Sequence, residues 1–401
     1  MLSVEEALAY ILADVGPLPA ESVALPNAQG RVLAADLVAP FALPPFANSS
    51  MDGYAVRSHD LAGASADRPV ALRLVGVVPA GGVYAGTVSA GTTVRIFTGA
   101  PLPDGADAVL QQELTAPGAA ADTVAMLAAV SASTNVRHAG SDIPMGTVVV
   151  ARGTALGSAE IAIAAAIGMA TVSVTRQPRV AIVATGDELV ELGQPLGPGQ
   201  IYNSNALMLA AMVRAAGGDP WLLPTAHDTM EAIRARFTQV QSADLVLSSG
   251  GVSVGDFDLV RIVLEELGQI AFWRVNVRPG KPLAFGHLGT TPFLGLPGNP
   301  VSSAVTFEVF GRPLLRTLLG YRSVQRPQIV VRLGADVAQG DRRHYVRAHL
   351  QFADGTVLAL PTGDQGSHRI ASLLDAEAFL IIPEGTGTLP AGELVNALLL
   401  V

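Results

Sequence analysis

From residue 179 onward the chain alternates short apolar strands with helical segments, and this alternation limits its possible folds more than any other feature. The stretches "RVAIVA" at 179–184, "DLVLSS" at 244–249 and "PFLGLP" at 292–297 are largely apolar, and helical patterns such as "NALMLAAMVRAAGG" stand between them. Such strands are typical of a parallel sheet that helices cover on both sides. We therefore predict a three-layer α/β domain with a mainly parallel sheet, whose ligands bind beyond the carboxyl ends of the strands.

The character of the sequence changes on either side of this domain. Many glycines and prolines between short apolar runs predict a β-rich domain inserted into an N-terminal domain, and strand-like patterns return near the C-terminus. Asp354-Gly355 predicts a hairpin there. The predicted domains are an N-terminal helical and extended domain (1–50 and 140–177), the inserted β-rich domain (51–139), the α/β domain (178–325) and a C-terminal β domain (326–401).

Composition excludes several classes of protein. Half of the 401 residues are apolar and 15% are charged, which suits a folded chain with more than one core. The net charge of −9 argues against general nucleic-acid binding, and the absence of cysteine leaves only oxygen or imidazole ligands for a metal. The apolar runs are too short to span a membrane, and Ser3 with Glu6 predicts a helix capping box rather than a signal peptide. We expect a cytoplasmic protein without nucleic-acid or membrane partners.

A glycine-rich stretch, "DLVLSSGGVSVGDFD", contains one predicted strand and the loop after it. Small residues between a buried strand and a helix leave backbone N–H groups accessible to an anion. Taken alone, the stretch fits a phosphate-binding loop and an ordinary glycine-rich turn equally well. The residues concerned are Ser248, Gly250, Gly251, Ser253, Gly255 and Asp258.

Two further loops follow strands of the same predicted sheet. "LPGNPVS" places Asn299 and Pro300 at a helix start, where free N–H groups attract an anion, although ordinary capping explains both residues about as well. "ATGDELV" places Asp187 and Glu188 directly after a strand. Acidic residues are common at helix starts, so this second loop is weak evidence by itself.

A cationic stretch, "FWRVNVRPGKPLAFG", places Arg274, Asn276 and Arg278 on one face of a predicted strand, with Lys281 just beyond it. Charges on an edge strand can simply prevent aggregation. Because the intervening residues are apolar and predict a packed opposite face, we favour anion binding.

Carboxylates and cations at one sheet edge together indicate a hard divalent cation, most simply Mg²⁺ bridging to phosphate. The chain contains no P-loop, no GxGxxG after a strand and no Ser-His-Asp set. Residue chemistry alone therefore predicts Mg²⁺-assisted phosphate chemistry or binding, without naming a substrate.

Motifs along essentially the whole chain resemble the MoeA-type molybdopterin molybdenumtransferases, which are related to the C-terminal domain of gephyrin. Besides the loops above they are "PPFANSSMDGYAVR", "IFTGAPLPDGADAV", "NVRHAGSDI" and "DQGSHRIASL", in the order of the family. The resemblance implies a β-rich N-terminal region, a central α/β molybdopterin-binding domain and a C-terminal β-barrel-like domain.

The same resemblance implies Mg²⁺-dependent insertion of molybdate into adenylated molybdopterin, with release of AMP and formation of molybdenum cofactor. It also implies a homodimer whose active site combines the α/β domain with the β-rich region of the partner subunit. A molybdopterin adenylyltransferase is a candidate protein partner. Two alternatives stay open: an adenylyltransferase acting one step earlier, and a non-catalytic pterin-binding scaffold.

Matching the family motifs residue by residue assigns roles to positions of this chain. The implied catalytic residues are Asp52, Thr98, Glu188, Asp228, Asp258, Arg274, Arg278 and Lys281, of which Glu188, Asp228 and Asp258 would hold the metal. The implied substrate-binding residues are Arg137, Asp142, Thr185, Gly186, Asp187, Ser248, Gly250, Gly251, Ser253, Gly255, Pro297, Gly298, Asn299, Pro300 and Ser302. Ser367 and His368 match a C-terminal motif for which we expect a structural role.

Arg274 and Arg278 stand where lysine is common in relatives; arginine keeps the charge but cannot carry a proton. Asp228 also suits the start of the following helix, as a capping pair with Glu231.

Overall fold

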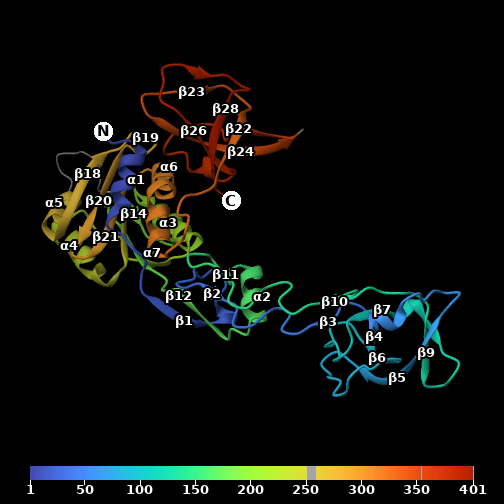
Figure 1. Cartoon of the computed structure of the whole chain (residues 1–401). Coiled ribbons are helices and arrows are strands. Elements are labelled where there is room, and N and C mark those ends of the chain that lie inside the picture. Colours follow the sequence, from blue (N-terminus) through green and yellow to red (C-terminus); the bar gives the residue numbers. More distant parts are fainter. Residues whose placement is uncertain (251–258, 354, 401) are drawn as a thin grey trace. The chain divides into compact units, whose positions relative to one another are not determined.

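The structure is a computed structural model of the chain that describes residues 1–250, 259–353 and 355–400. It divides into two units, both drawn in Figure 1. The first unit comprises Met1–Ala35, Arg152–Gly157 and Thr171–Val401, and the second comprises Asp36–Ala151 and Ser158–Ala170. Neither unit is a continuous segment, and the finer division into four domains stays a prediction.

A six-stranded sheet forms the centre of the α/β region in the first unit. Its order is β16-β13-β17-β21-β20-β18, in which the first four strands are parallel and β20 pairs antiparallel with both β21 and β18. The mainly parallel sheet predicted from the sequence is confirmed. The strands are β13 (Arg179–Ala184), β16 (Asp219–Leu222), β17 (Leu245–Ser249), β18 (Gly268–Arg274), β20 (Pro282–Leu288) and β21 (Thr291–Leu296).

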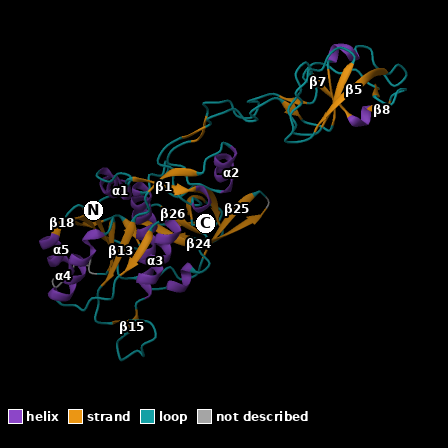
Figure 2. Cartoon of the chain, turned by 90° about the horizontal axis from the view of Figure 1, so that it is seen from below, coloured by secondary structure: helices purple, strands orange, loops and turns teal. Residues whose placement is uncertain are grey.

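Helices cover both faces of this sheet, as Figure 2 shows, because alternate side chains of each strand enter different cores. On β13, Val180 and Ile182 pack with α1, α3, α6 and α7, whereas Ala181 and Val183 pack with α4 and α5. The helices are α1 (Val4–Ala13), α3 (Ser204–Ala216), α4 (Met230–Gln239), α5 (Leu259–Leu267), α6 (Pro300–Thr306), the π-helical η5 (Phe307–Gly311) and α7 (Arg312–Leu318).

Several helix ends follow from local sequence. The capping box of Ser3 and Glu6 starts α1, and Gly217 ends α3 in the left-handed conformation with φ of 102°. Asn299 occupies the N-cap position of α6, but its side chain makes no capping hydrogen bond.

The predicted cap of α4 was wrong. The helix begins at Met230, and its N-cap is Thr229, whose hydroxyl accepts a hydrogen bond from the Ala232 N–H at 3.2 Å. Asp228 lies one residue earlier, and its own N–H donates to an Asp187 carboxylate oxygen at 3.3 Å. The Asp228 carboxylate is therefore not used in capping.

A closed barrel of five strands follows the α/β region, which confirms the barrel expected at the C-terminus. The ring runs β24-β25-β22-β28-β26 and closes because β26 also pairs with β24. β24 and β25 pair antiparallel with Ala353 opposite Thr356, as the predicted hairpin requires, although Asp354 of the predicted turn lies outside the described residues. The strands are β22 (Gln328–Leu333), β24 (Arg343–Ala353), β25 (Thr356–Pro361), β26 (Ala378–Ile382) and β28 (Leu394–Leu399).

The cationic stretch does not form one strand, contrary to prediction. β18 ends at Arg274, and the short β19 (Val277–Arg278) pairs in parallel with β24 of the barrel. The predicted alternation is nevertheless present, because Val275 and Val277 are buried while Arg274 and Arg278 are exposed. The strand breaks because its second half bonds to a different sheet.

Further short elements complete the first unit. β1 (Ala20–Ala24) and β12 (Thr171–Thr175) form an antiparallel pair. The others are β14 (Leu189–Val190), β15 (Ile201–Tyr202), β23 (Val337–Ala338), β27 (Thr388–Leu389) and the 3₁₀ turns η1 (Leu25–Asn27), η4 (Val240–Ser242) and η6 (Ile370–Leu373).

The second unit is built mainly from strands, in agreement with the β-rich region predicted for it. Its principal sheet has the order β7-β4-β6-β5-β9-β8, and β3 pairs with β10 and β2 with β11. Across the described residues of both units, the helices are too short or too polar to span a membrane.

The elements of the second unit are β2 (Leu37–Val38), β3 (Asn48–Ser49), β4 (Gly53–Val56), η2 (Ser58–Leu61), β5 (Val70–Val78), β6 (Thr92–Ile96), β7 (Ala108–Gln111), η3 (Gln112–Leu114), β8 (Thr115–Pro117), β9 (Thr123–Met126), β10 (Val136–Arg137), β11 (Val148–Val150) and α2 (Ser158–Ala166).

Candidate active site

Three of the predicted loops meet at the carboxyl edge of the α/β sheet. Thr185 follows β13, Gly250 follows β17 and Gly298 follows β21. A Cβ atom on Gly250 would lie 3.7 Å from the Thr185 carbonyl oxygen, and one on Gly298 would lie 3.7 Å from the Cα of Gly250. The neighbouring parallel strands thus bring together residues that are far apart in sequence.

Two glycines at this edge are needed for conformation or for space. Gly250 has φ of +92°, which L-residues with a side chain rarely adopt. Gly186 has φ of +147°, and a Cβ there would lie 2.5 Å from a carboxylate oxygen of Glu188. The absence of a side chain at position 186 therefore leaves room for the Glu188 carboxylate.

An asparagine that the sequence did not single out joins two of the loops. The Asn205 side-chain amide donates to the Ser249 hydroxyl at 2.9 Å and to the Gly298 carbonyl at 2.7 Å. No local pattern distinguishes Asn205 from an ordinary residue in the first turn of α3. Ser248, a predicted binding residue, is only 1% exposed, so it lies within the sheet rather than on an open surface.

A cavity of about 550 Å³ lies between these loops and the barrel end of the first unit. Its lining contains six predicted binding or catalytic residues, namely Gly250, Arg278, Pro297, Gly298, Asn299 and Ser302. The remaining lining residues are Pro279, Gly280, Pro282, Arg342, Gln365, Gly366 and Ser367. The sequence had not indicated a role for Arg342.

The lining of this cavity is cationic. Arg278 and Arg342 contribute guanidinium groups, and no Asp or Glu is present among the described lining residues. Arg342 donates to the Val277 carbonyl at 3.2 Å and forms an ion pair with Asp341 at 3.3 Å. Because the chain as a whole carries a net charge of −9, the cavity provides local attraction for an anion that the molecule otherwise repels.

A segment of the C-terminal region closes one side of the cavity. Buried Arg347 donates from Nε to the Ser372 hydroxyl at 3.0 Å and from Nη2 to the Gly366 carbonyl at 3.3 Å. The Ser367 carbonyl accepts the Val301 N–H at 3.1 Å. One N–H group at the start of α6 is therefore already bonded, although the sequence had suggested that these groups are free.

Two of the three predicted cations lie elsewhere. Arg274 and Lys281 are exposed at the end of the β18–β20 hairpin, where Arg274 pairs with Pro282, and neither lines the cavity. Only Arg278 contributes to it, because the break after β18 places that residue beside the barrel.

The predicted acids of the α/β region lie on neighbouring loops. The Gly186 N–H donates to the Ala226 carbonyl at 3.2 Å, which holds the loop after β13 against the segment before α4. His227 Nδ1 lies 3.0 Å from an Asp187 carboxylate oxygen, and this bond, with the Asp228 N–H, lowers the pKa of Asp187. The Glu188 and Asp228 side chains are exposed.

The described residues do not by themselves complete a metal site. Nowhere in the described ranges do three acidic or histidine side chains gather closely enough to hold a metal ion. The third predicted metal ligand, Asp258, lies outside the described residues, as do Gly251, Ser253 and Gly255.

Asp52 and Thr98 form a hydrogen-bonded pair in the second unit. One Asp52 carboxylate oxygen accepts both the Thr98 N–H at 2.8 Å and the Thr98 hydroxyl at 2.7 Å. The backbone bond, followed by the hydroxyl bond, lowers the pKa of Asp52. Arg137 pairs with Asn48 across β10 and β3, and Arg137 and Asp142 are both exposed.

Comparison with known proteins gives consistent matches along the chain. Family models match the MoeA N-terminal region (domains I and II) at residues 2–168, a probable molybdopterin binding domain at 181–317 and the MoeA C-terminal region (domain IV) at 330–400. Molybdopterin molybdenumtransferase 2 of Mycobacterium tuberculosis is 39% identical over 379 residues, covering 92% of this chain and 93% of that protein. The Haemophilus influenzae molybdopterin molybdenumtransferase is 35% identical over 405 residues, covering 99% and 98%.

Solved structures agree with these matches. The molybdopterin biosynthesis MoeA protein of Pyrococcus horikoshii superimposes with a TM-score of 0.87 at 34% identity, covering 100% of this chain and 99% of that one.

Proposed function

The chain belongs to the MoeA family of molybdopterin molybdenumtransferases, and on this premise we propose that it inserts molybdate into adenylated molybdopterin and releases AMP. The product is molybdenum cofactor. Because the dithiolene of the pterin supplies sulfur ligands, the reaction is compatible with a chain that has no cysteine.

The observation that carries this proposal is the cationic cavity at the carboxyl edge of the sheet. No carboxylate is present among the described lining residues. Arg342 pairs with the exposed Asp341 outside the lining, and Arg278 forms no ion pair among the described residues, so both guanidinium groups can also bind the oxygens of molybdate or phosphate. Arg274 and Lys281 add positive charge at the hairpin end outside the cavity. Preorganised cations of this kind stabilise the negative charge that develops on phosphate oxygens and on the departing AMP.

Mg²⁺ is part of the proposal. Glu188, Asp228 and Asp258 would hold it, and carboxylate oxygens are the donors that this ion prefers. Of these, Glu188 and Asp228 are exposed on adjoining loops, which fits a site that leaves positions open for substrate oxygens. When bound, the ion would neutralise charge on the pyrophosphate.

The test is to mix the protein with adenylated molybdopterin, Mg²⁺ and molybdate and to measure AMP. We expect release that depends on molybdate and exceeds a protein-free blank. Release that is the same without molybdate would reject the transferase proposal, and ATP-dependent adenylation of molybdopterin would favour an adenylyltransferase instead.

We further propose a homodimer whose active site uses Asp52 and Thr98 of one subunit with Glu188 of the other. The pairing of Asp52 with Thr98 in a unit separate from the α/β region supports this arrangement. Mixing Asp52→Asn chains with Glu188→Gln chains should restore up to about a quarter of wild-type activity by random pairing. Failure of this complementation in confirmed mixed dimers would indicate a site within one chain.

A further inference from the structure

A buried histidine beside the cavity arginines has no hydrogen-bond partner. His344 of β24 is 5% exposed, and neither of its ring nitrogens is bonded to any described residue. Most buried polar side chains are hydrogen-bonded, and those that are not call for an explanation. This ring is therefore a candidate for a role that begins when something binds nearby.

The strand pairing places His344 next to the cavity. β19 and β24 run parallel, and Arg278 is the residue opposite His344 in their register. Directly opposite residues of paired strands project to the same face of the sheet. Arg342 precedes His344 by two residues, and both Arg278 and Arg342 line the cavity. The imidazole therefore neighbours the groups that we expect to contact an oxyanion.

The charges acting on this ring are positive. They belong to Arg278 on β19, to Arg347 on β24 and to Arg342 just before β24, while β26 places uncharged Ile382 opposite. Burial, followed by these three cations, lowers the pKa of His344 to about 4. The ring is thus neutral at pH 7 while the cavity arginines are not neutralised by an anion.

We propose that His344 is a further residue of the oxyanion site, which takes up one proton from solvent when a tetrahedral dianion binds beside Arg278 and Arg342. The ligand class is molybdate or a phosphate monoester. The inference rests on the oxyanion-binding role proposed for the cavity, but it does not require the transfer reaction.

Electrostatics gives the size of the effect. A dianion offsets the positive charges that keep the ring neutral, and two negative charges at about 7 Å, with an effective dielectric constant of about 20, raise the proton affinity of the ring roughly 1000-fold. The imidazolium then adds a third positive charge to the site. Because the proton binds with the anion, affinity should fall about tenfold between pH 6 and pH 8.

The experiment is calorimetric titration of the full chain with sodium molybdate, at pH 6.5, in buffers of different ionisation enthalpy. The dependence of heat on buffer gives the number of protons taken up per anion. We expect uptake of more than half a proton for wild type, none for His344→Asn, and loss of the pH dependence of affinity in that variant. His349→Asn is the matched control, because His349 lies on the same strand and pairs with Glu377.

A parallel titration with AMP distinguishes a free oxyanion from a phosphate monoester, and subtracting the His344→Asn result removes the titration of AMP itself. A difference in proton uptake between wild type and His344→Asn, seen with molybdate or with AMP, supports the coupling and identifies the ligand. Equal proton uptake in the two proteins with both ligands overturns the proposal.

Imidazole NMR signals of wild type, followed during molybdate addition, provide a readout that does not depend on folding of the variant. A His344 ring that stays neutral at saturation also overturns the proposal. A chain without transferase activity could still show the proton uptake, so failure of the two proposals is distinguishable.

Discussion

The cavity beside the barrel and the loop after β13 belong to the same unit but carry opposite charges. The cavity presents Arg278 and Arg342 without a carboxylate among its described lining residues, whereas the loop after β13 and its neighbour present Asp187, Glu188 and Asp228. A carboxylate within the cavity would compete with an anion for the arginines, whereas the one acid that pairs with Arg342 among the described residues, Asp341, is exposed and outside the lining. Separation of the charges leaves the cations available to an oxyanion and the exposed acids available to a cation.

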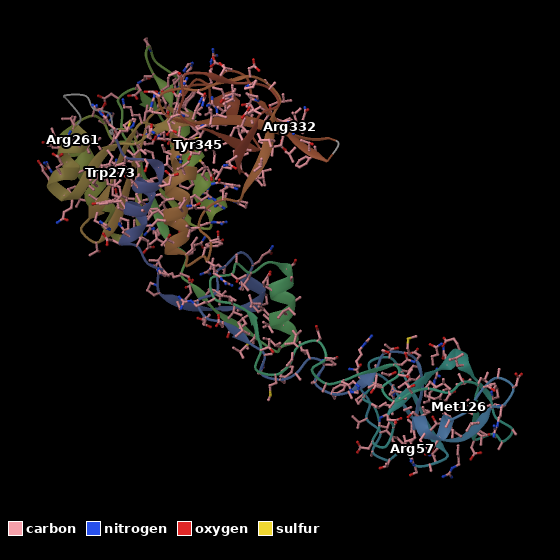
Figure 3. The ribbon with its side chains drawn as sticks, turned by 45° about the horizontal axis from the view of Figure 1, so that its top comes forward. Arg57, Met126, Arg261, Trp273, Arg332 and Tyr345 are labelled. Carbon is pink, nitrogen blue, oxygen red and sulfur yellow. The ribbon has the colours of Figure 1, made fainter. Side chains whose placement is uncertain are left out.

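The largest effect on activity is expected when the cavity loses the positive charge of Arg278. Arg278→Gln should lower kcat/KM for molybdate-dependent AMP release about 100-fold, because a charge-assisted bond contributes roughly 2–3 kcal/mol. Arg278→Lys keeps the charge and should stay within about tenfold of wild type. Arg332→Gln removes a barrel arginine outside the cavity, labelled in Figure 3, and serves as the control. Full activity of Arg278→Gln would contradict the cationic role.

Substitution of an acid on the loop after β13 should instead change how activity depends on Mg²⁺. Glu188→Gln is expected to lower activity about tenfold at limiting Mg²⁺, and less when Mg²⁺ is in excess, because it removes one of the proposed oxygen ligands. Activity measured over a range of Mg²⁺ concentrations checks this, with Glu231→Gln on α4 as the control. If the Mg²⁺ dependence of Glu188→Gln matches wild type, the metal-binding role is wrong.

A smaller effect is expected from the bond that holds the cavity loops together. Asn205→Ala removes hydrogen bonds to Ser249 and Gly298, so KM should rise about tenfold or less and unfolding free energy should fall by about 1–2 kcal/mol. Gln177→Ala loses an amide bond to the Gly217 carbonyl near the opposite end of β13 and should leave KM unchanged. Equal KM changes in both variants would show that the loop contact has no special importance.

The smallest effect concerns the pH at which Asp187, on the loop after β13, ionises. His227→Asn should raise the pKa of Asp187 toward its ordinary value, because the largest cause of the lowered pKa is the bond to His227. With a lowered folded pKa, ionised Asp187 stabilises the fold above its unfolded pKa, and this contribution disappears as pH falls through the folded pKa. Carboxyl NMR titration measures the change, and the Asp52 signal in the second unit should not move.

Much of the fold could be predicted because it depends on local periodicity. The apolar runs became the parallel strands, and Ser3 and Glu6 formed the predicted capping box because capping uses backbone groups within a few residues. The cap of α4 could not be chosen in this way, since Asp228 and Thr229 are both good capping residues. The Asp228 N–H donates a hydrogen bond to the Asp187 carboxylate, which lies on another loop. This bond distinguishes Asp228 from Thr229.

By itself, the sequence determined the alternation of strands and helices, the family motifs and the glycine-rich loops at strand ends, because these depend on neighbours along the chain. Only the tertiary structure decided which charges share a site. It placed Arg278 beside the barrel by moving β19 to another sheet, left Arg274 and Lys281 outside the cavity, and added Arg342 to the cavity lining. It also used Asn205 to join the Ser249 and Gly298 segments. These choices depend on strand pairing between distant segments, and a pattern read along a single strand does not record which sheet that strand will join.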